Sequence, residues 1–93
     1  MIINIPDFIA ATKNNDISTL CIDDDIVDVI QSLWDHKIVT LGCCSGHGKE
    51  NPSVIIADSY KKEDIKDIKR IINKSGNAKR KWKILQWSLI NVA

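Results

Sequence analysis

Two segments of this chain carry apolar side chains on one side only, at the spacing of an α-helix. Residues 24–35 hold them at i, i+3, i+4, i+7 and i+8, and residues 61–74 hold isoleucines at i, i+3, i+6 and i+7. A helix with one apolar face must bury that face against another element, so neither segment is stable alone. The apolar positions are Ile26, Val29, Ile30, Leu33 and Trp34 in the first segment, and Ile65, Ile68, Ile71 and Ile72 in the second.

Charged residues mark both ends of the first helix. The aspartates at 23–25 lie at its start, and His36 and Lys37 lie at its end, where the helix dipole favours each charge. The three aspartates could also hold a divalent metal, but capping is the simpler explanation. We assign His36 no role beyond the helix end.

Short runs typical of strands lie between and after the two helices. In the last run, Leu85 and Trp87 alternate with Gln86 and Ser88. The expected bounds are 5–11 for a short first helix, and 17–22, 38–41, 53–57 and 82–92 for the strands. These elements predict a small α/β (α+β) two-layer sandwich, with a mixed or antiparallel sheet that carries the two main helices on one face.

The length of 93 residues predicts a single domain over residues 1–93. Folding at this size buries roughly two-thirds of the chain surface, so one small core is feasible, and a homo-oligomer would add buried area. No apolar run approaches the ~20 residues of a membrane helix. The first residues lack the basic and then apolar pattern of a signal peptide, so we expect a cytoplasmic protein without a membrane partner.

The two halves of the chain differ in charge. Residues 1–40 hold seven aspartates and two lysines, a net charge of −5, whereas residues 41–93 hold eleven basic and five acidic residues, a net charge of +6. This asymmetry indicates either an anionic partner for the basic half or two helix faces that attract each other. Trp82, between two lysines, could stack on a base or pack beneath the lysine stems.

The glycine-rich segment 41–49, LGCCSGHGK, is the part of the chain best suited to a site. Successive N–H groups in such a loop can cradle an anion, and Lys49 can add a charge. His47 changes charge near neutral pH and could serve as a phosphate donor, a metal ligand or a general acid or base. The spacing matches neither a phosphate-binding loop of the GxxxxGK[ST] type nor a dinucleotide-binding loop. The candidate ligand-binding residues are Thr40, Cys44, Ser45, Gly46, His47, Gly48, Lys49 and Trp82.

The three cysteines are expected to be free thiols. Cys43 and Cys44 are adjacent, so they bridge poorly, and their side chains point in opposite directions. Cys44 with His47 supplies only two zinc ligands, and Cys21 a third at most, so we expect no metal. A nucleophilic pair of Cys and His would need an orienting third group that the sequence does not identify. One cysteine of the pair is expected to pack in the core.

Residues 21–49 resemble small proteins of phages and bacterial mobile elements. Those proteins share an acidic helix start, an "LW…GI.T" turn and the motif "GSCCGHGK", matched here at Thr40, Gly42, Cys44 and the segment 46–49. This chain departs from the pattern at two places. The usual "SCCGH" reads CCSGH at residues 43–47, so Ser45 replaces a cysteine, which further weakens a zinc site, and Lys37 replaces the usual glycine of the turn. More distantly, residues 44–47 are similar to the "SCSGR" motif of wybutosine-synthesis proteins, which handle a tRNA base with S-adenosylmethionine. That resemblance implies a loop suited to a nucleotide-like ligand, in contact with Ser45 and His47.

The residues favour a binding protein over an enzyme, because no complete catalytic set is visible. We expect a small phage-type protein that binds an anionic, nucleotide-like ligand through the loop at 42–49 and sequesters a host immune second messenger. Two alternatives stay open: an inhibitor that binds a host defence protein or nuclease, and an enzyme acting on nucleotides or RNA with His47 as acid or base. No cofactor is expected.

Overall fold

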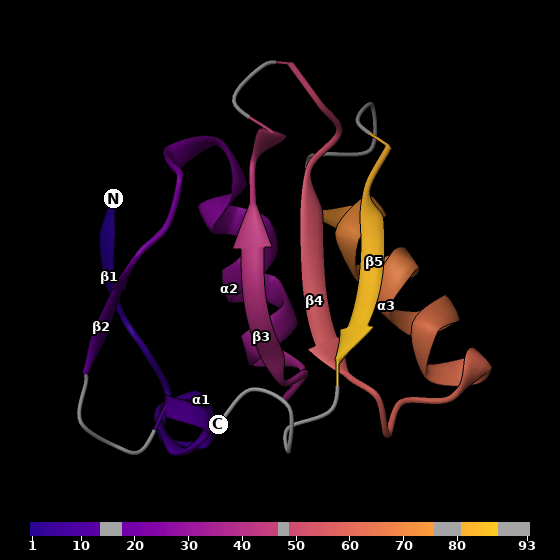
Figure 1. Cartoon of the computed structure of the whole chain (residues 1–93), viewed down its shortest axis with the longest axis horizontal. Helices are drawn as coiled ribbons and strands as arrows, with labels where there is room; N and C mark the ends of the chain where they lie inside the picture. The colour runs from indigo at the N-terminus through magenta and orange to yellow at the C-terminus, as the bar shows by residue number, and fades with distance from the viewer. Residues whose placement is uncertain (14–17, 47–48, 76–80, 88–93) are drawn as a thin grey trace.

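The computed structural model describes residues 1–13, 18–46, 49–75 and 81–87 (Figure 1). It confirms the predicted α+β class, with the two main helices and a mixed sheet. No helix among the described residues has the length and apolar character needed to cross a membrane. The elements are β1 (Ile2–Asn4), α1 (Asp7–Ala10), η1 (Ala11–Lys13), β2 (Thr19–Cys21), η2 (Asp24–Ile26), α2 (Val27–Asp35), β3 (Thr40–Cys44), β4 (Ser53–Ala57), α3 (Lys62–Lys74) and β5 (Lys83–Trp87).

The main sheet has three strands in the order β3-β4-β5. The β3 and β4 strands are antiparallel, with an irregularity in register between Thr40 and Gly42. The β4 and β5 strands are parallel and pair over five residues. A parallel pair needs a crossover connection, which α3 supplies with the usual right-handed turn (Figure 1).

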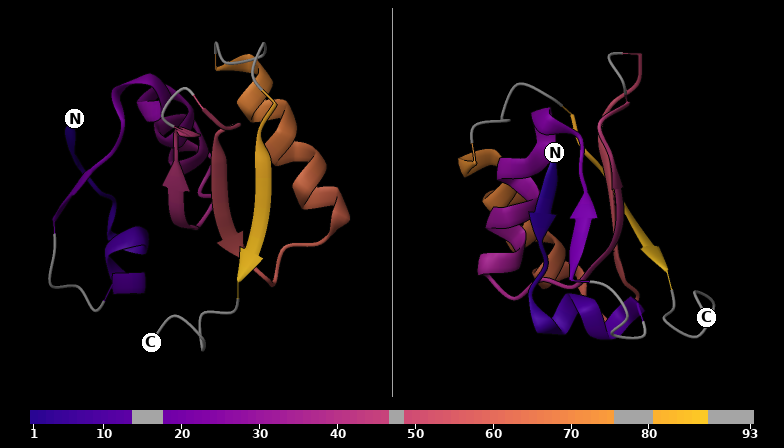
Figure 2. Two further views of the ribbon diagram at one scale, coloured as in Figure 1. Left: turned by 45° about the horizontal axis from the view of Figure 1, so that its top comes forward. Right: turned by 90° about the vertical axis from the view of Figure 1, so that its left-hand side faces the viewer.

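Both main helices cover the same face of this sheet (Figure 2). The central strand directs Val54 and Ile56 to that face, and both side chains are fully buried. They join a single apolar cluster with the predicted stripes of the two helices. The members from the helices include Ile30 and Leu33 of α2 and Ile68 and Ile72 of α3. The helical spacing of these residues therefore identified most of the core correctly.

The beginning of the chain differs from the prediction. β1 was not predicted, and it pairs antiparallel with β2 in a separate two-stranded sheet. The short helix begins at Asp7, after Pro6, because the residues before the proline are extended. The Met1 ammonium donates to the Ile22 carbonyl oxygen at 2.8 Å and lies 2.9 Å from Asp24 Oδ1. The hydrogen bond with Asp24 raises the pKa of this ammonium above its usual value of 8.0.

The structure confirms a strand within the last predicted segment, but the apolar residues that alternate along it, Leu85 and Trp87, do not face the core. Ile84 packs against the core, whereas Leu85 and Trp87 are 44% and 52% exposed. The alternation of Leu85 and Trp87 with polar residues therefore indicates a strand whose larger apolar side chains lie on the open face of the sheet. Residues 88–92 of the predicted strand lie outside the described residues.

A buried hydrogen bond ties α2 to the first strand of the main sheet. Trp34 Nε1 donates to Thr40 Oγ1 at 2.8 Å, and both residues are buried. The indole needs this acceptor because a buried N–H without a partner is destabilising. Trp34 is thus a core residue, as its helical position predicts.

We expect Thr40→Val to lower the free energy of unfolding by about 1–3 kcal/mol, because it keeps the shape of the side chain but leaves the Trp34 N–H unpaired. Urea denaturation followed by tryptophan fluorescence measures the change. Thr40→Ser keeps the acceptor and serves as the control. Equal stability of Thr40→Val and the wild type would contradict this role.

Candidate functional site

The loop after β3 is anchored to the start of the first main helix. Ser45 is 3% exposed, and its backbone N–H donates to Asp23 Oδ2 at 3.3 Å. A carboxylate therefore occupies a position at which a bound anion could accept this hydrogen bond. Asp23 and Ser45 also make further interactions, so both residues are built into the fold.

Gly46 makes the turn of this loop. Its φ of 80° lies in the region that favours glycine, and an added Cβ would lie 3.2 Å from the Asn51 carbonyl oxygen. The Gly46 N–H donates to Cys44 Sγ at 3.4 Å, and its carbonyl accepts the N–H groups of Lys49 at 2.9 Å and Glu50 at 3.1 Å. Each of the N–H groups at 45, 46, 49 and 50 thus has an acceptor within the protein. His47 and Gly48 lie outside the described residues, so their predicted roles stay predictions.

The adjacent cysteines point to opposite faces of the sheet, as predicted. Cys43 is paired with Val54 and packs against the apolar core, whereas Cys44 is paired with Ser53 on the other face. All three cysteines are free thiols, and Cys21 is exposed. Among the residues that the structure describes, no group of three or more His, Cys, Asp or Glu side chains is arranged to hold a metal ion.

The other predicted site residues lie in different environments. Thr40 is buried at the far end of β3 from the loop, and its hydroxyl is engaged by Trp34. Lys49 is exposed. The Lys83 N–H donates to the Pro52 carbonyl at 2.9 Å, so Trp82 lies near the end of the loop. Trp82 packs partly against the core, and its indole N–H is buried without a partner in the described structure.

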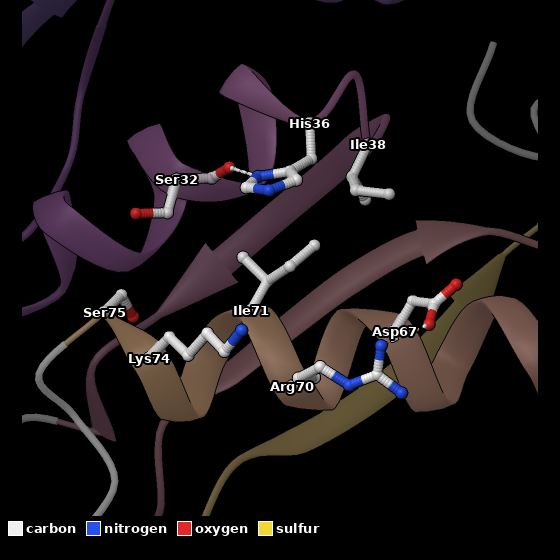
Figure 3. Close-up of a pocket in the computed structure, with 8 residues that line it drawn as sticks. All are labelled: Ser32, His36, Ile38, Asp67, Arg70, Ile71, Lys74 and Ser75. Carbon is white, nitrogen blue, oxygen red and sulfur yellow. Dashed lines mark hydrogen bonds and ion pairs between the residues drawn. The ribbon is translucent and has the colours of Figure 1, made fainter.

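A groove between α2 and α3 provides a more accessible place for a ligand (Figure 3). Its volume is about 480 Å³, within the range of roughly 300–1,000 Å³ that is typical of small-molecule sites. Apolar side chains, two hydroxyls and charged groups share its wall. The lining residues are Ser32, His36, Ile38, Asp67, Arg70, Ile71, Lys74 and Ser75.

The cationic groups of the groove come mainly from α3. Arg70 and Lys74 are one helical turn apart and so share a face, but Arg70 Nη1 lies 3.3 Å from Asp67 Oδ1. Figure 3 shows the Lys74 side chain extending beside Ile71, with the His36 ring opposite on α2. His36 Nδ1 donates to the Ser32 carbonyl oxygen at 2.8 Å, which fixes the ring in that position.

Sequence reasoning missed this groove. It assigned His36 no role beyond the helix end, and it interpreted the basic half of the chain as a partner for an anion or as a helix face that attracts an acidic one. The positions of Asp67, Arg70, Ile71 and Lys74 follow i, i+3, i+4 and i+7, so they could have been recognised as one mixed face of a helix. That the face lies beside α2 follows only from the tertiary structure.

A second hollow lies between the start of the chain and α2. It is larger, at about 600 Å³, and is lined by residues that include Phe8, Asp35 and Lys37. The Lys37 ammonium lies 5.5 Å from the centroid of the Phe8 ring, in a cation–π contact. This hollow has one cationic side chain, Lys37, for one carboxylate, whereas the α2–α3 groove has two, Arg70 and Lys74, for one carboxylate, so the groove attracts anions more.

Comparison of the chain with protein-family models, with curated proteins and with solved structures found no match.

We expect Asp23→Ala to release the Ser45 amide and so to increase its hydrogen exchange by at least about tenfold, the change expected for loss of ~1.4 kcal/mol of local stability. Exchange is measured by NMR on labelled protein. Asp28→Ala, which removes an exposed carboxylate of α2, is the control. An unchanged Ser45 exchange rate in Asp23→Ala would show that this hydrogen bond does not hold the loop.

Proposed function

We propose that this protein binds a small anionic, nucleotide-like molecule in the groove between α2 and α3. The observation that carries the proposal is the placement of Arg70 and Lys74 over one groove that also has an apolar wall. A nucleotide has the same two parts, because its phosphates are anionic and its base is flat and apolar on both faces. The net charge of +6 on residues 41–93 favours the same kind of ligand.

Side-chain charges must supply most of the attraction in this groove. Ser32 lies in the last turn of α2 and His36 directly follows this helix. Lys74 ends α3 and Ser75 directly follows it, so all four residues lie where the helix dipoles are negative. Arg70 and Lys74 can bind phosphate oxygens, Arg70 in a bidentate manner. Ile38 and Ile71 can pack against one face of a base, and the His36 ring can stack on it.

The loop at 42–49 remains a second candidate for contact with the ligand. Its described N–H groups are engaged within the protein, so binding there would depend on His47 and on the Lys49 side chain, which is exposed. The loop is a weaker candidate than the groove, because its described N–H groups already have acceptors, whereas the cationic side chains of the groove reach solvent.

Binding without turnover would suit a protein that sequesters a signalling nucleotide, the role expected from the resemblance to phage proteins. Signalling nucleotides occur in the cytoplasm, which is also the location expected from the sequence. An enzyme would consume the nucleotide, so chromatography of the mixture after incubation separates the two alternatives.

Calorimetric titration with a panel of nucleoside mono- and triphosphates and cyclic dinucleotides tests the proposal. We expect binding of at least one member, and a loss of affinity of about tenfold or more in the double variant Arg70→Ala, Lys74→Ala, because charged hydrogen bonds contribute about 1.5–3 kcal/mol. The control is Lys69→Ala, which removes one exposed lysine from another face of α3. Absence of heat with the whole panel, or an equal loss in the control, would contradict the proposal.

A substitution of Asp67 is expected to increase the affinity for the nucleotide, whereas the double variant is expected to decrease it. Its carboxylate lies 3.3 Å from Arg70 Nη1 and competes with an anionic ligand for the guanidinium. We expect Asp67→Asn to increase nucleotide affinity by about two- to fivefold, because an exposed pair of this kind contributes roughly 0.5–1 kcal/mol. Unchanged or weaker binding in the same calorimetric titration would show that Arg70 does not contact the ligand.

A further inference from the structure

The β5 strand is the edge of the main sheet in the part of the chain that the structure describes. It carries two of the four large apolar side chains that are most exposed, Leu85 at 44% and Trp87 at 52%. Lys83, Leu85 and Trp87 alternate along the strand, so they share the face that α3 does not cover (Figure 2). An apolar stripe along a sheet edge is typical of a surface that binds another strand.

The hydrogen bonds of β5 show which of its backbone groups face outward. The Lys83 N–H donates to the Pro52 carbonyl at 2.9 Å, and the Trp87 carbonyl accepts the Asp58 N–H at 3.0 Å. Residues 83, 85 and 87 therefore direct their backbone groups toward β4. Because these directions alternate along a strand, Ile84 and Gln86 direct their N–H and carbonyl groups to the outer edge.

Two features by which proteins usually prevent strand pairing, a bulge and a proline, are absent from β5. The five residues of β5 pair in continuous register with β4, without a bulge, and they include no proline. The opposite edge strand, β3, does contain an irregularity, between Thr40 and Gly42. Lys83 is the single charged residue of β5, and it lies at the first position of the strand.

We propose that a second copy of this chain pairs with β5 in an antiparallel manner, with the two-fold axis at Leu85. Ile84 of each copy then lies opposite Gln86 of the other, and these two pairs exchange four backbone hydrogen bonds. Leu85 meets its own equivalent in a non-hydrogen-bonded pair, where opposing side chains are closest. The two three-stranded sheets become one sheet of six strands.

The side chains of this arrangement complement one another, which favours a second copy over another occupant. In the same register Lys83 of each copy lies opposite Trp87 of the other, on the open face of the sheet. An ammonium over an indole is a favourable cation–π pair, and the symmetry forms it twice. The same contact would bury Leu85 and Trp87, which are exposed in the single copy.

The positive charge of α3 opposes this association. Lys62, Lys66 and Lys69 recur every three or four residues, so they share a flank of α3 that lies away from the groove residues Asp67 and Arg70. In the dimer these flanks of the two copies would face each other. Salt screens such repulsion, so we expect a tighter dimer at 0.5 M than at about 0.05 M sodium chloride.

Sedimentation equilibrium of the full chain tests the proposal up to about 100 μM, where weak interfaces are populated. We expect a monomer–dimer equilibrium, and a dissociation constant at least about tenfold higher for Leu85→Lys, which places two like charges on the axis. Ile2→Lys, which changes a side chain that is 73% exposed on β1, is the matched control and should dimerise as the wild type does. A monomer throughout, or equal effects of both variants, would overturn the proposal.

Hydrogen exchange provides a second readout that does not depend on a variant. The Ile84 and Gln86 amides should become protected as the protein concentration rises, whereas the Leu85 amide should be protected at all concentrations. Protection that does not change with concentration at Ile84 and Gln86 would exclude pairing through this edge, even if the protein dimerises by another surface.

Discussion

The burial of one face of β4 is the constraint on which the rest of the structure depends. Val54 and Ile56 are completely buried on this strand, in the cluster that also receives the apolar stripes of α2 and α3. Because β4 is central, its neighbours must pair on both sides, and the two helices must lie together on one face. The groove between α2 and α3 is a consequence of this packing, since two adjacent helices on one sheet leave a furrow between their exposed flanks.

Much of this fold could be predicted from the sequence, because the apolar periods of the helices are strong. The stripe from Ile26 to Trp34 predicted both a helix and its buried face, and Trp34 is indeed in the core. Weaker signals failed where tertiary contacts decide the outcome. Residues 2–4 form a strand only because residues 19–21 pair with them, and a three-residue strand has almost no pattern of its own.

The candidate site was less predictable than the fold. Glycine content and residue types directed attention to residues 42–49, but they could not show that Asp23, distant in the sequence, accepts the Ser45 N–H. They also could not show which face of α3 lies beside His36. We therefore propose that side chains of the groove, rather than backbone groups of the loop, attract the anion. The groove is lined by residues of α2 and α3 and by residues that follow them, whereas the proposed dimer pairs through β5, so ligand binding and self-association are compatible.

Mapping of the bound nucleotide by NMR tests the central claim most directly. The labelled protein is titrated with the nucleotide that binds most tightly in the calorimetric panel, and backbone amide shifts are followed. We expect the largest shifts at residues 32–38 and 67–75, with saturation at the calorimetric affinity, and small shifts at 44–46. Large shifts confined to the loop at 42–49, with the groove unchanged, would contradict the assignment of the site.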